Sequence, residues 1–162
     1  MTDAWELAAR ERIRDTLARY SWGGDGLRLD DVAASFCEDG ELEIRGGDVH
    51  RGRDAIVAFI GGVGRTEPGP AAEVGGSRPI VRHSVSNVRF VELGPDHALV
   101  ASYFTVFTEI GLDHYGRYRD RFVPVGDDWL IRHRFVSTDW AAAGSTMVRQ
   151  EGGMPTMPRR SG

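Results

Sequence analysis

Residues 82–90 read Arg-His-Ser-Val-Ser-Asn-Val-Arg-Phe and form the segment around which the rest of the chain is organised. A glycine- and proline-rich loop ends just before it at Pro79, and the β-branched and polar residues predict a strand. Side chains alternate between the faces of a strand, so His83, Val85 and Asn87 are expected on one face, with His83 and Asn87 about 13 Å apart. If that face lines a cavity, the imidazole and the amide belong to a site. If it only packs in a sheet, His83 is a hydrogen-bonded core histidine.

Three more strand-like segments follow, at 98–108, 115–125 and 129–138. Each is rich in β-branched or aromatic residues. Short turns at 94–96 and 126–128, both containing glycine and aspartate, join the first to the second and the third to the fourth. Strands joined by short turns pair antiparallel, so the second half of the chain predicts an antiparallel meander.

Helices are predicted before these strands. Asp3 and Glu6 have the spacing of a capping pair, and Gly23-Gly24 is the expected stop of the first helix. Its apolar stripe is Trp5, Ala9, Ile13, Leu17 and Tyr20. Two further helices, at 29–36 and 53–63, flank a short hairpin of 41–45 with 48–51. Helices first and strands afterwards indicate an α+β fold. We expect one domain over 1–140 and a tail over 141–162 that is flexible or covers a rim.

The composition excludes several classes of function. The chain has 162 residues and a formal net charge of -4, with acids and arginines interspersed, so no nucleic-acid-binding surface is expected. No apolar run is long enough to span a membrane, and the charged first twenty residues argue against a secretory signal, so a cytoplasmic location is expected. All twenty basic residues are arginine, which removes Schiff-base chemistry on a lysine amine.

Metal and cofactor sites are not expected. Cys37 is the only cysteine, so neither a disulfide framework nor a thiolate metal cluster is available. The other histidines lie far apart in the sequence, without an acid at a recognised ligand spacing: His50, His97, His114 and His133. A Gly-x-Ser-x-Gly motif, typical of hydrolases with a serine nucleophile, does not occur.

Four short segments together resemble a known family. They are Tyr-Ser-Trp-Gly-Gly-Asp at 20–25, Phe-Cys-Glu-Asp-Gly at 36–40, His-Ser-Val-Ser-Asn at 83–87, and Gly-Arg-Tyr-Arg-Asp at 116–120 followed by Asp-Trp at 128–129. In this order and spacing the chain resembles the SnoaL-like group of the nuclear transport factor 2-like superfamily, the group that contains scytalone dehydratase. The resemblance runs from about Trp5 to Trp140. It implies a curved antiparallel sheet and three N-terminal helices that enclose a cone-shaped, mostly apolar pocket.

The resemblance also implies a catalytic pair. An aspartate after the first helix and a histidine on the first long strand match Asp25 and His83. A carboxylate bound to one imidazole nitrogen raises the basicity of the other, which gives a base usable near neutral pH. Tyr20 has the spacing of a tyrosine that faces the substrate in bile acid dehydratases. The alternatives are that Asp25 only ends the helix and that Tyr20 only packs in the core.

Other positions depart from the family's pattern. Thr108 stands where scytalone dehydratase has a second active-site histidine, and Ile44 where it has a tyrosine. The late-strand arginine of the bile acid dehydratases aligns near Ser137. Arg82 and Arg89 are expected to be surface charges. Besides the catalytic candidates, the expected substrate-binding residues are Trp22, Asn87, Phe104, Val106, Thr108, Tyr118 and Ser137.

These residues predict a cofactor-free lyase, isomerase or cyclase, similar to a dehydratase, that acts on a hydrophobic oxygenated small molecule such as a polyketide, an aromatic compound or a steroid. The alternative is a ligand-binding or assembly module without turnover on the same fold. An epoxide-opening hydrolase would need two acids beside an arginine, and Arg119 and Asp120 alternate faces. A homodimer is also expected, through an apolar patch on the outer sheet face that consists of Val88, Phe90, Tyr103 and Phe107.

Overall fold

The computed structural model describes residues 3–63 and 80–148. Its elements in chain order are α1 (Ala4–Asp25), α2 (Leu29–Ala34), β1 (Phe36–Ile44), β2 (Val49–Arg51), α3 (Arg53–Gly62), β3 (Arg82–Leu93), β4 (Ala98–Thr108), β5 (Gly111–Val125) and β6 (Asp128–Ala141). The predicted α+β fold is confirmed. The expected loop at 64–79 and the tail beyond 148 lie outside the described residues.

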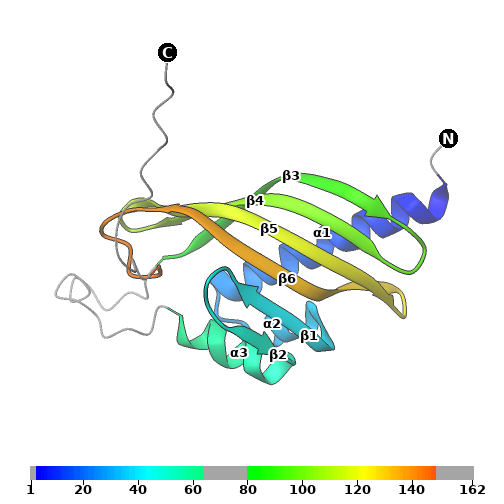
Figure 1. Ribbon diagram of the computed structural model, residues 1–162, viewed down its shortest axis with the longest axis horizontal. Helices are drawn as coiled ribbons and strands as arrows, with labels where there is room; N and C mark the ends of the chain where they lie inside the picture. The colour runs from blue at the N-terminus through cyan, green and yellow to red at the C-terminus, as the bar shows by residue number, and fades with distance from the viewer. Residues whose placement is uncertain (1–2, 64–79, 149–162) are drawn as a thin grey trace, which may run out of the picture.

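The six strands form one curved sheet in the order β2-β1-β6-β5-β4-β3 (Figure 1). The four long strands β3 to β6 are an antiparallel meander, as their short turns predict. β1, however, pairs with β6 in parallel, so the sheet is mixed and not wholly antiparallel. The turn argument applies only to consecutive strands, and β1 meets β6 after most of the chain has intervened.

Helix α1 lies across the inner face of the sheet and covers the long strands (Figure 1). Its buried residues recur at helical spacing and include Ile13, Leu17 and Tyr20, whereas Trp5 is exposed and the Asp3 side chain makes no capping hydrogen bond. The helix continues through Gly23 to Asp25 and does not stop at the glycines. A Cβ atom at Gly23 would lie 2.9 Å from Cβ of Asp31, so this glycine permits the close packing of α2.

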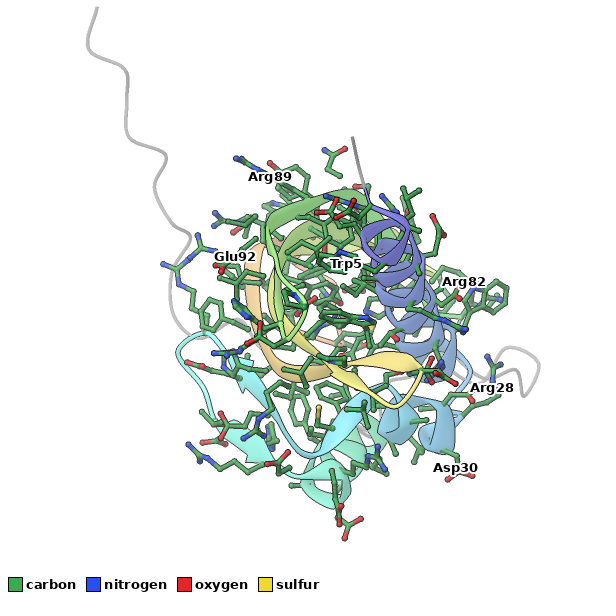
Figure 2. The ribbon with its side chains drawn as sticks, turned by 90° about the vertical axis from the view of Figure 1, so that its right-hand side faces the viewer. Trp5, Arg28, Asp30, Arg82, Arg89 and Glu92 are labelled. Carbon is green, nitrogen blue, oxygen red and sulfur yellow. The ribbon has the colours of Figure 1, made fainter. Side chains whose placement is uncertain are left out.

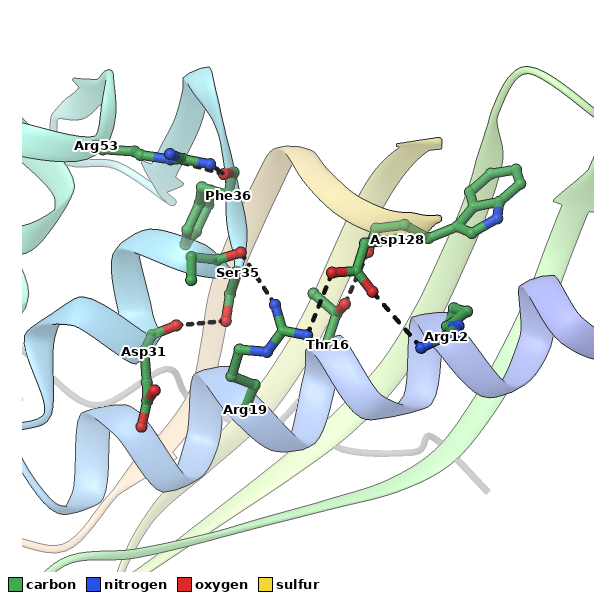
Figure 3. A network of polar contacts seen from close by, with 10 residues as sticks. Arg12, Thr16, Arg19, Asp31, Ser35, Phe36, Arg53 and Asp128 are labelled. Atoms are coloured by element: carbon green, nitrogen blue, oxygen red, sulfur yellow. Dashed lines mark hydrogen bonds and ion pairs between the residues drawn. The ribbon is translucent and has the colours of Figure 1, made fainter. Parts of the chain in front are cut away.

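Polar contacts fix α1 and α3 to the strands (Figure 3). The Thr16 hydroxyl donates to the backbone carbonyl of Trp129 at 2.7 Å, which joins α1 to β6. Arg19 donates to the carbonyl of Ala34 at 3.2 Å. Two nitrogens of Arg53 donate to the carbonyl of Phe36, at 3.0 and 2.7 Å, and so join α3 to β1. These bonds thus join α1 to β6 and to α2, and α3 to β1.

A β-bulge in β3 changes which side chains face inward. Asn87 has a φ of 52°, and the pairing with β4 shifts register between Ser86 and Arg89. Asparagine tolerates this left-handed conformation better than most residues. Beyond the bulge, Val88 and Phe90 pack against the core, while Asn87 is exposed. Two predictions are therefore wrong: Asn87 does not share the face of His83, and Val88 and Phe90 are not on the outer face.

Among the described helices, none combines the length and the apolarity that crossing a bilayer requires.

Candidate active site

His83 lies near the start of β3 and is held by the carboxylate at the end of α1. Asp25 accepts one hydrogen bond from the backbone N–H of His83 at 2.9 Å and one from its ring Nδ1 at 2.5 Å. A carboxylate can only accept, so in the neutral imidazole the hydrogen lies on Nδ1 and the free lone pair on Nε2. The Asp25 and His83 side chains are 11% and 18% exposed, which leaves the imidazole sheltered but reachable. The structure thus brings together the two residues that the sequence singled out.

Both residues line a groove of about 580 Å³ between α1 and β3. Pockets of this order of size hold small organic ligands. Its apolar wall consists of Leu17 from α1 with Val85 and Val88 from β3. The groove therefore offers an apolar surface directly beside the Asp25–His83 pair.

The remainder of the groove is aromatic and basic. Trp22 lines it and is 70% exposed, an unusual position for a large apolar ring. Arg28 and Arg82 also line it, and Figure 2 shows both on the side of α1, with Arg89 lying away from them. Arg82, expected to be a surface charge, therefore belongs to the groove.

A second imidazole lies close to His83. The pairing of β3 with β4 places His83 opposite Val106, and the pairing of β4 with β5 places Val106 opposite His114. The three residues form one row across the sheet. The two imidazole rings are 6.5 Å apart between centroids and nearly perpendicular. His114 is buried and has Phe104 as a further ring neighbour at 5.9 Å.

His114 has a carboxylate of its own. Its Nδ1 is 2.7 Å from Oδ1 of Asp113, which also accepts from the Ser145 hydroxyl at 2.6 Å, while Oδ2 accepts from Thr108 at 3.0 Å. Burial would raise the pKa of Asp113, but these three hydrogen bonds outweigh it and hold the pKa below its usual value. Burial lowers the pKa of His114, the hydrogen bond to Asp113 opposes this, and His83 lowers it further. The site therefore contains two Asp–His pairs whose charges influence each other.

A buried cation lies deeper in the fold. Arg134 on β6 is fully buried and donates two hydrogen bonds to Asp120 on β5, at 2.9 and 2.7 Å. The guanidinium carbon is 4.2 Å from the ring centre of Tyr20 and 4.0 Å from that of Tyr118. Its Nη1 has no hydrogen-bond partner in the part of the chain that the structure describes.

The charge of Arg134 persists despite its burial. Desolvation opposes the charge, but Asp120 outweighs it, and the pKa of Arg134 lies above its usual value. Burial also raises the pKa of Tyr20 and of Tyr118, so both phenols keep their protons at neutral pH. Among the described ion pairs Arg134 meets one acid, which differs from the two-acid arrangement of an epoxide-opening hydrolase.

The remaining predicted site residues divide into two groups. Phe104 and Val106 are buried on the inner face near the histidines, and Phe104 stacks on Tyr118 at 4.6 Å. Thr108, at the position of the second family histidine, donates a hydrogen bond to Asp113, the carboxylate that contacts His114. Ser137 is buried and its hydroxyl accepts from Arg45 at 3.3 Å. Of the predicted substrate-binding residues only Trp22 lines the groove. The others, and the catalytic candidate Tyr20, do not line it: Asn87, Phe104, Val106, Thr108, Tyr118 and Ser137.

His114 and Arg134 were not among the site residues predicted from the sequence. His114 fell outside the predicted strand, which was expected to begin at residue 115, whereas β5 begins at Gly111. The short interval between Thr108 and Gly111 was the signal available, because a tight hairpin there continues the pairing through His114. Arg134 faces Asp120 only because the pairing of β5 with β6 shifts between Arg121 and Phe122. Such a bulge leaves no clear mark in the sequence.

Within residues 3–63 and 80–148, no group of three or more histidine, cysteine or acidic side chains is arranged to hold a metal ion.

Comparisons with known proteins agree with this architecture. The family model of the SnoaL-like domain matches residues 5–135. Similar solved structures include a protein of unknown function from Mycobacterium tuberculosis, with 26% identity, 79% of this chain and 70% of that chain covered, and a TM-score of 0.65. A candidate scytalone dehydratase from Novosphingobium aromaticivorans has 23% identity, with 84% and 87% covered and a TM-score of 0.67. A nuclear transport factor 2-like protein with a cystatin-like fold, from the same species, has 24% identity, with 90% and 96% covered and a TM-score of 0.67. Among curated proteins, none matches the chain significantly.

Proposed function

The chain belongs to the SnoaL-like domain family, and from this premise we propose that it is a lyase, isomerase or cyclase that works by general acid–base catalysis without a cofactor. The observation that carries the proposal is the Asp25–His83 pair, with its hydrogen bonds of 2.5 and 2.9 Å, on the wall of a groove of small-molecule size. Proton transfer by a positioned imidazole contributes roughly 10²–10⁴-fold to a rate.

In the proposed reaction, Nε2 of His83 removes a proton from a carbon next to a carbonyl group or an oxygenated ring. Asp25 holds the ring in the required tautomer and stabilises the imidazolium that forms. The electron pair of the broken C–H bond then forms a double bond, either by expelling a hydroxyl group or by shifting toward the carbonyl oxygen. Dehydration, isomerisation and cyclisation all share this first step.

His114 is the second proton carrier in this proposal. Its ring lies 6.5 Å from that of His83, and the pKa of His114 is lowered in part by His83, so the two imidazoles resist carrying a proton at the same time. A pair that shares one proton can supply a base and an acid within one site. The imidazole that is protonated would give its proton to the departing hydroxyl group, which leaves as water.

Arg134, Tyr20 and Tyr118 are buried behind the groove and do not line it. They are proposed to stabilise negative charge on a substrate oxygen that reaches inward past His83. The phenols remain protonated because burial raises the pKa of each, so both can donate. Nη1 of Arg134 is a donor without a partner among the described residues. Fixed donors aimed at a developing oxyanion are among the largest contributors to enzymatic rate acceleration.

The groove suggests a substrate that is largely apolar but carries oxygen. Leu17, Val85 and Val88 supply the apolar wall, and Trp22 offers a ring face for stacking. Arg28 is paired with Asp31 at 2.8 Å, whereas Arg82 forms no ion pair with any carboxylate that the structure describes. Arg82 is therefore the group proposed to meet an oxygenated or acidic substituent.

A homodimer remains part of the proposal, through a corrected patch. The exposed aromatic residues on the outer face are Tyr103, Phe107, Tyr115 and Trp140, of which Tyr115 and Trp140 stack at 5.6 Å. Patches of this kind commonly mark contact surfaces.

The test is proton exchange in heavy water. Cyclic β-hydroxy ketones and hydroxylated aromatic ketones are incubated with the protein, and NMR follows deuterium entering next to the carbonyl or the loss of water. The parent protein should act on at least one compound. His83→Ala should lower its rate by about 10²–10⁴-fold, and Asp25→Asn should also lower it strongly, because the amide favours the wrong tautomer. The double variant should be little worse than the worse single one.

His133→Ala is the matched control, because His133 also contacts an acid, Glu43, at 2.8 Å but lies away from the groove. Its rate should equal that of the parent. If the parent binds these compounds and exchanges no proton in any of them, the result contradicts the proposed enzyme and favours a binding module without turnover.

A further inference from the structure

The segment that follows β6 folds back onto the second Asp–His pair. The backbone N–H of Ala142 donates to the carbonyl of Asp113 at 2.7 Å, and the Ser145 hydroxyl donates to the Asp113 carboxylate at 2.6 Å. The side chain of Met147 packs against the hydrophobic core. Residues 142–148, which the sequence predicted to be flexible or to cover a rim, therefore reach the buried carboxylate beside His114.

The Ser145 hydroxyl is held as a donor. The backbone N–H groups of Met147 and Val148 both donate to its oxygen, at 3.2 Å each. A hydroxyl has one hydrogen and two lone pairs, so two incoming amides leave the hydrogen for Asp113. Hydrogen bonds that a hydroxyl accepts also strengthen the one it donates.

Ser145 and His114 use the same carboxylate oxygen. Oδ1 of Asp113 accepts from Ser145 at 2.6 Å and is 2.7 Å from Nδ1 of His114, whereas Thr108 occupies Oδ2 at 3.0 Å. Two donors on one oxygen share its negative charge. Ser145 must therefore weaken the support that Asp113 gives to a protonated His114.

We propose that Ser145 is a positioning residue, which fixes the Asp113 carboxylate and limits the basicity of His114, so that residues 142–148 form part of the active site. Only the last step, from the basicity of His114 to turnover, rests on the proposed function. The competition for Oδ1 stands on the geometry alone.

Removal of the Ser145 hydroxyl should change the pKa of His114 in one direction only, upward. The ionisable groups near His114 are Asp113 on its own strand and His83, with its partner Asp25, across the sheet, while Phe104 from β4 is apolar. Among these groups only Asp113 contacts the Ser145 hydroxyl, and its removal takes one of the three hydrogen bonds from that carboxylate. Oδ1 is then left to His114 alone, which favours the imidazolium and raises the pKa of His114 by about half to one pH unit, a part of the worth of one hydrogen bond.

The experiment is a titration of the imidazole ¹⁵N signals by NMR in the full chain, without any substrate. His114→Gln assigns the His114 signals. Ser145→Ala should raise the pKa of His114, and Ser145→Thr, which keeps a hydroxyl, should restore the parental value. Ser145→Cys keeps only a weak donor, so the pKa of His114 in this variant should lie between the values in the parent and in Ser145→Ala. This variant replaces Ser145→Ala in the test if the alanine variant does not fold.

Thr108→Val is the matched control, because it removes a donor from the other oxygen of the same carboxylate. It should shift the pKa of His114 less than Ser145→Ala does. An unchanged His114 titration in a folded Ser145→Ala or Ser145→Cys variant, or equal shifts for Thr108→Val and Ser145→Ala, would overturn the proposal. Because the readout needs no turnover, failure of the proton-exchange assay bears on the proposed function alone.

Discussion

Two arginines join β5 to β6 with the same hydrogen-bond geometry, but Arg134 is buried between the rings of Tyr20 and Tyr118 and Arg117 is exposed. Arg134 donates to Asp120 from Nε and Nη2 at 2.9 and 2.7 Å, and Arg117 donates to Asp139 from the same two nitrogens at 2.9 and 2.8 Å. Both side chains of the first pair are 0% exposed, whereas those of the second are 42% and 31% exposed. Replacing each arginine by methionine therefore compares the loss of the same two hydrogen bonds in a buried and in an exposed environment.

The two substitutions should lower the free energy of unfolding by amounts that differ several-fold. Arg134→Met leaves Asp120 as an uncompensated buried charge and should lower the free energy of unfolding by about 3–5 kcal/mol. Arg117→Met removes an ion pair that water already screens and should cost less than about 1 kcal/mol. At about 2–4 °C per kcal/mol for a chain of this size, the Arg134 variant should melt about 6–20 °C below the parent.

The assay is urea denaturation followed by circular dichroism, with thermal melts beside it. Asp120→Leu combined with Arg134→Met removes both charges at similar volume and should recover most of the loss, since a buried pair adds little over a well-packed apolar one. The methionine also keeps favourable sulfur contacts with Tyr20 and Tyr118. Equal losses for Arg134→Met and Arg117→Met, or a double variant as unstable as the single one, would refute the reasoning.

Four further predictions follow from the same structure. Gly116→Ala places a Cβ atom against the carbonyl oxygen of Ser137 and should lower the free energy of unfolding by about 3 kcal/mol or more. Gly24→Ala, in α1 with nothing within 4 Å, should leave it unchanged or raise it by about 0.5–1 kcal/mol. Denaturant titrations that rank the two variants equally would contradict this. Burial lowers the pKa of His114, so the contribution of neutral His114 to stability is complete above about pH 6.5 and is lost as the pH falls below that value. In thermal melts, the melting temperature of His114→Gln should therefore fall less in acid than that of the parent. Parallel curves of melting temperature against pH would count against this. Light scattering at tens of micromolar, a rough range for a standard interface, should show a dimer that Trp140→Glu dissociates, and a monomeric parent would exclude the outer-face patch as the contact. Prolonged chelation should leave the melting temperature unchanged, and a drop reversed by one specific ion would reveal a metal requirement.

Much of the architecture can be predicted from the pattern of neighbouring residues along the sequence. The stripe through Ile13, Leu17 and Tyr20 predicts α1, and the turns at 94–96 and 126–128 predict the hairpins that the structure contains. Helical and strand periods depend on neighbouring residues, so a sequence displays them directly. The end of α1 was predicted at Gly23-Gly24 instead of Asp25, because the closeness of α2 to Gly23 is a tertiary contact.

By itself the sequence determined the α+β order of elements and, through four short segments, the pairing candidates Asp25 and His83. The tertiary structure alone decided which faces those elements present. A bulge at Asn87 reverses the alternation in β3, a shift between Arg121 and Phe122 turns Arg134 inward, and the row through Val106 brings His114 beside His83. The reason is that alternation has a period of two, so one extra residue in a strand exchanges its inner and outer faces. Whether a strand accepts that residue depends on the packing of partners far away in the chain, which no local pattern contains.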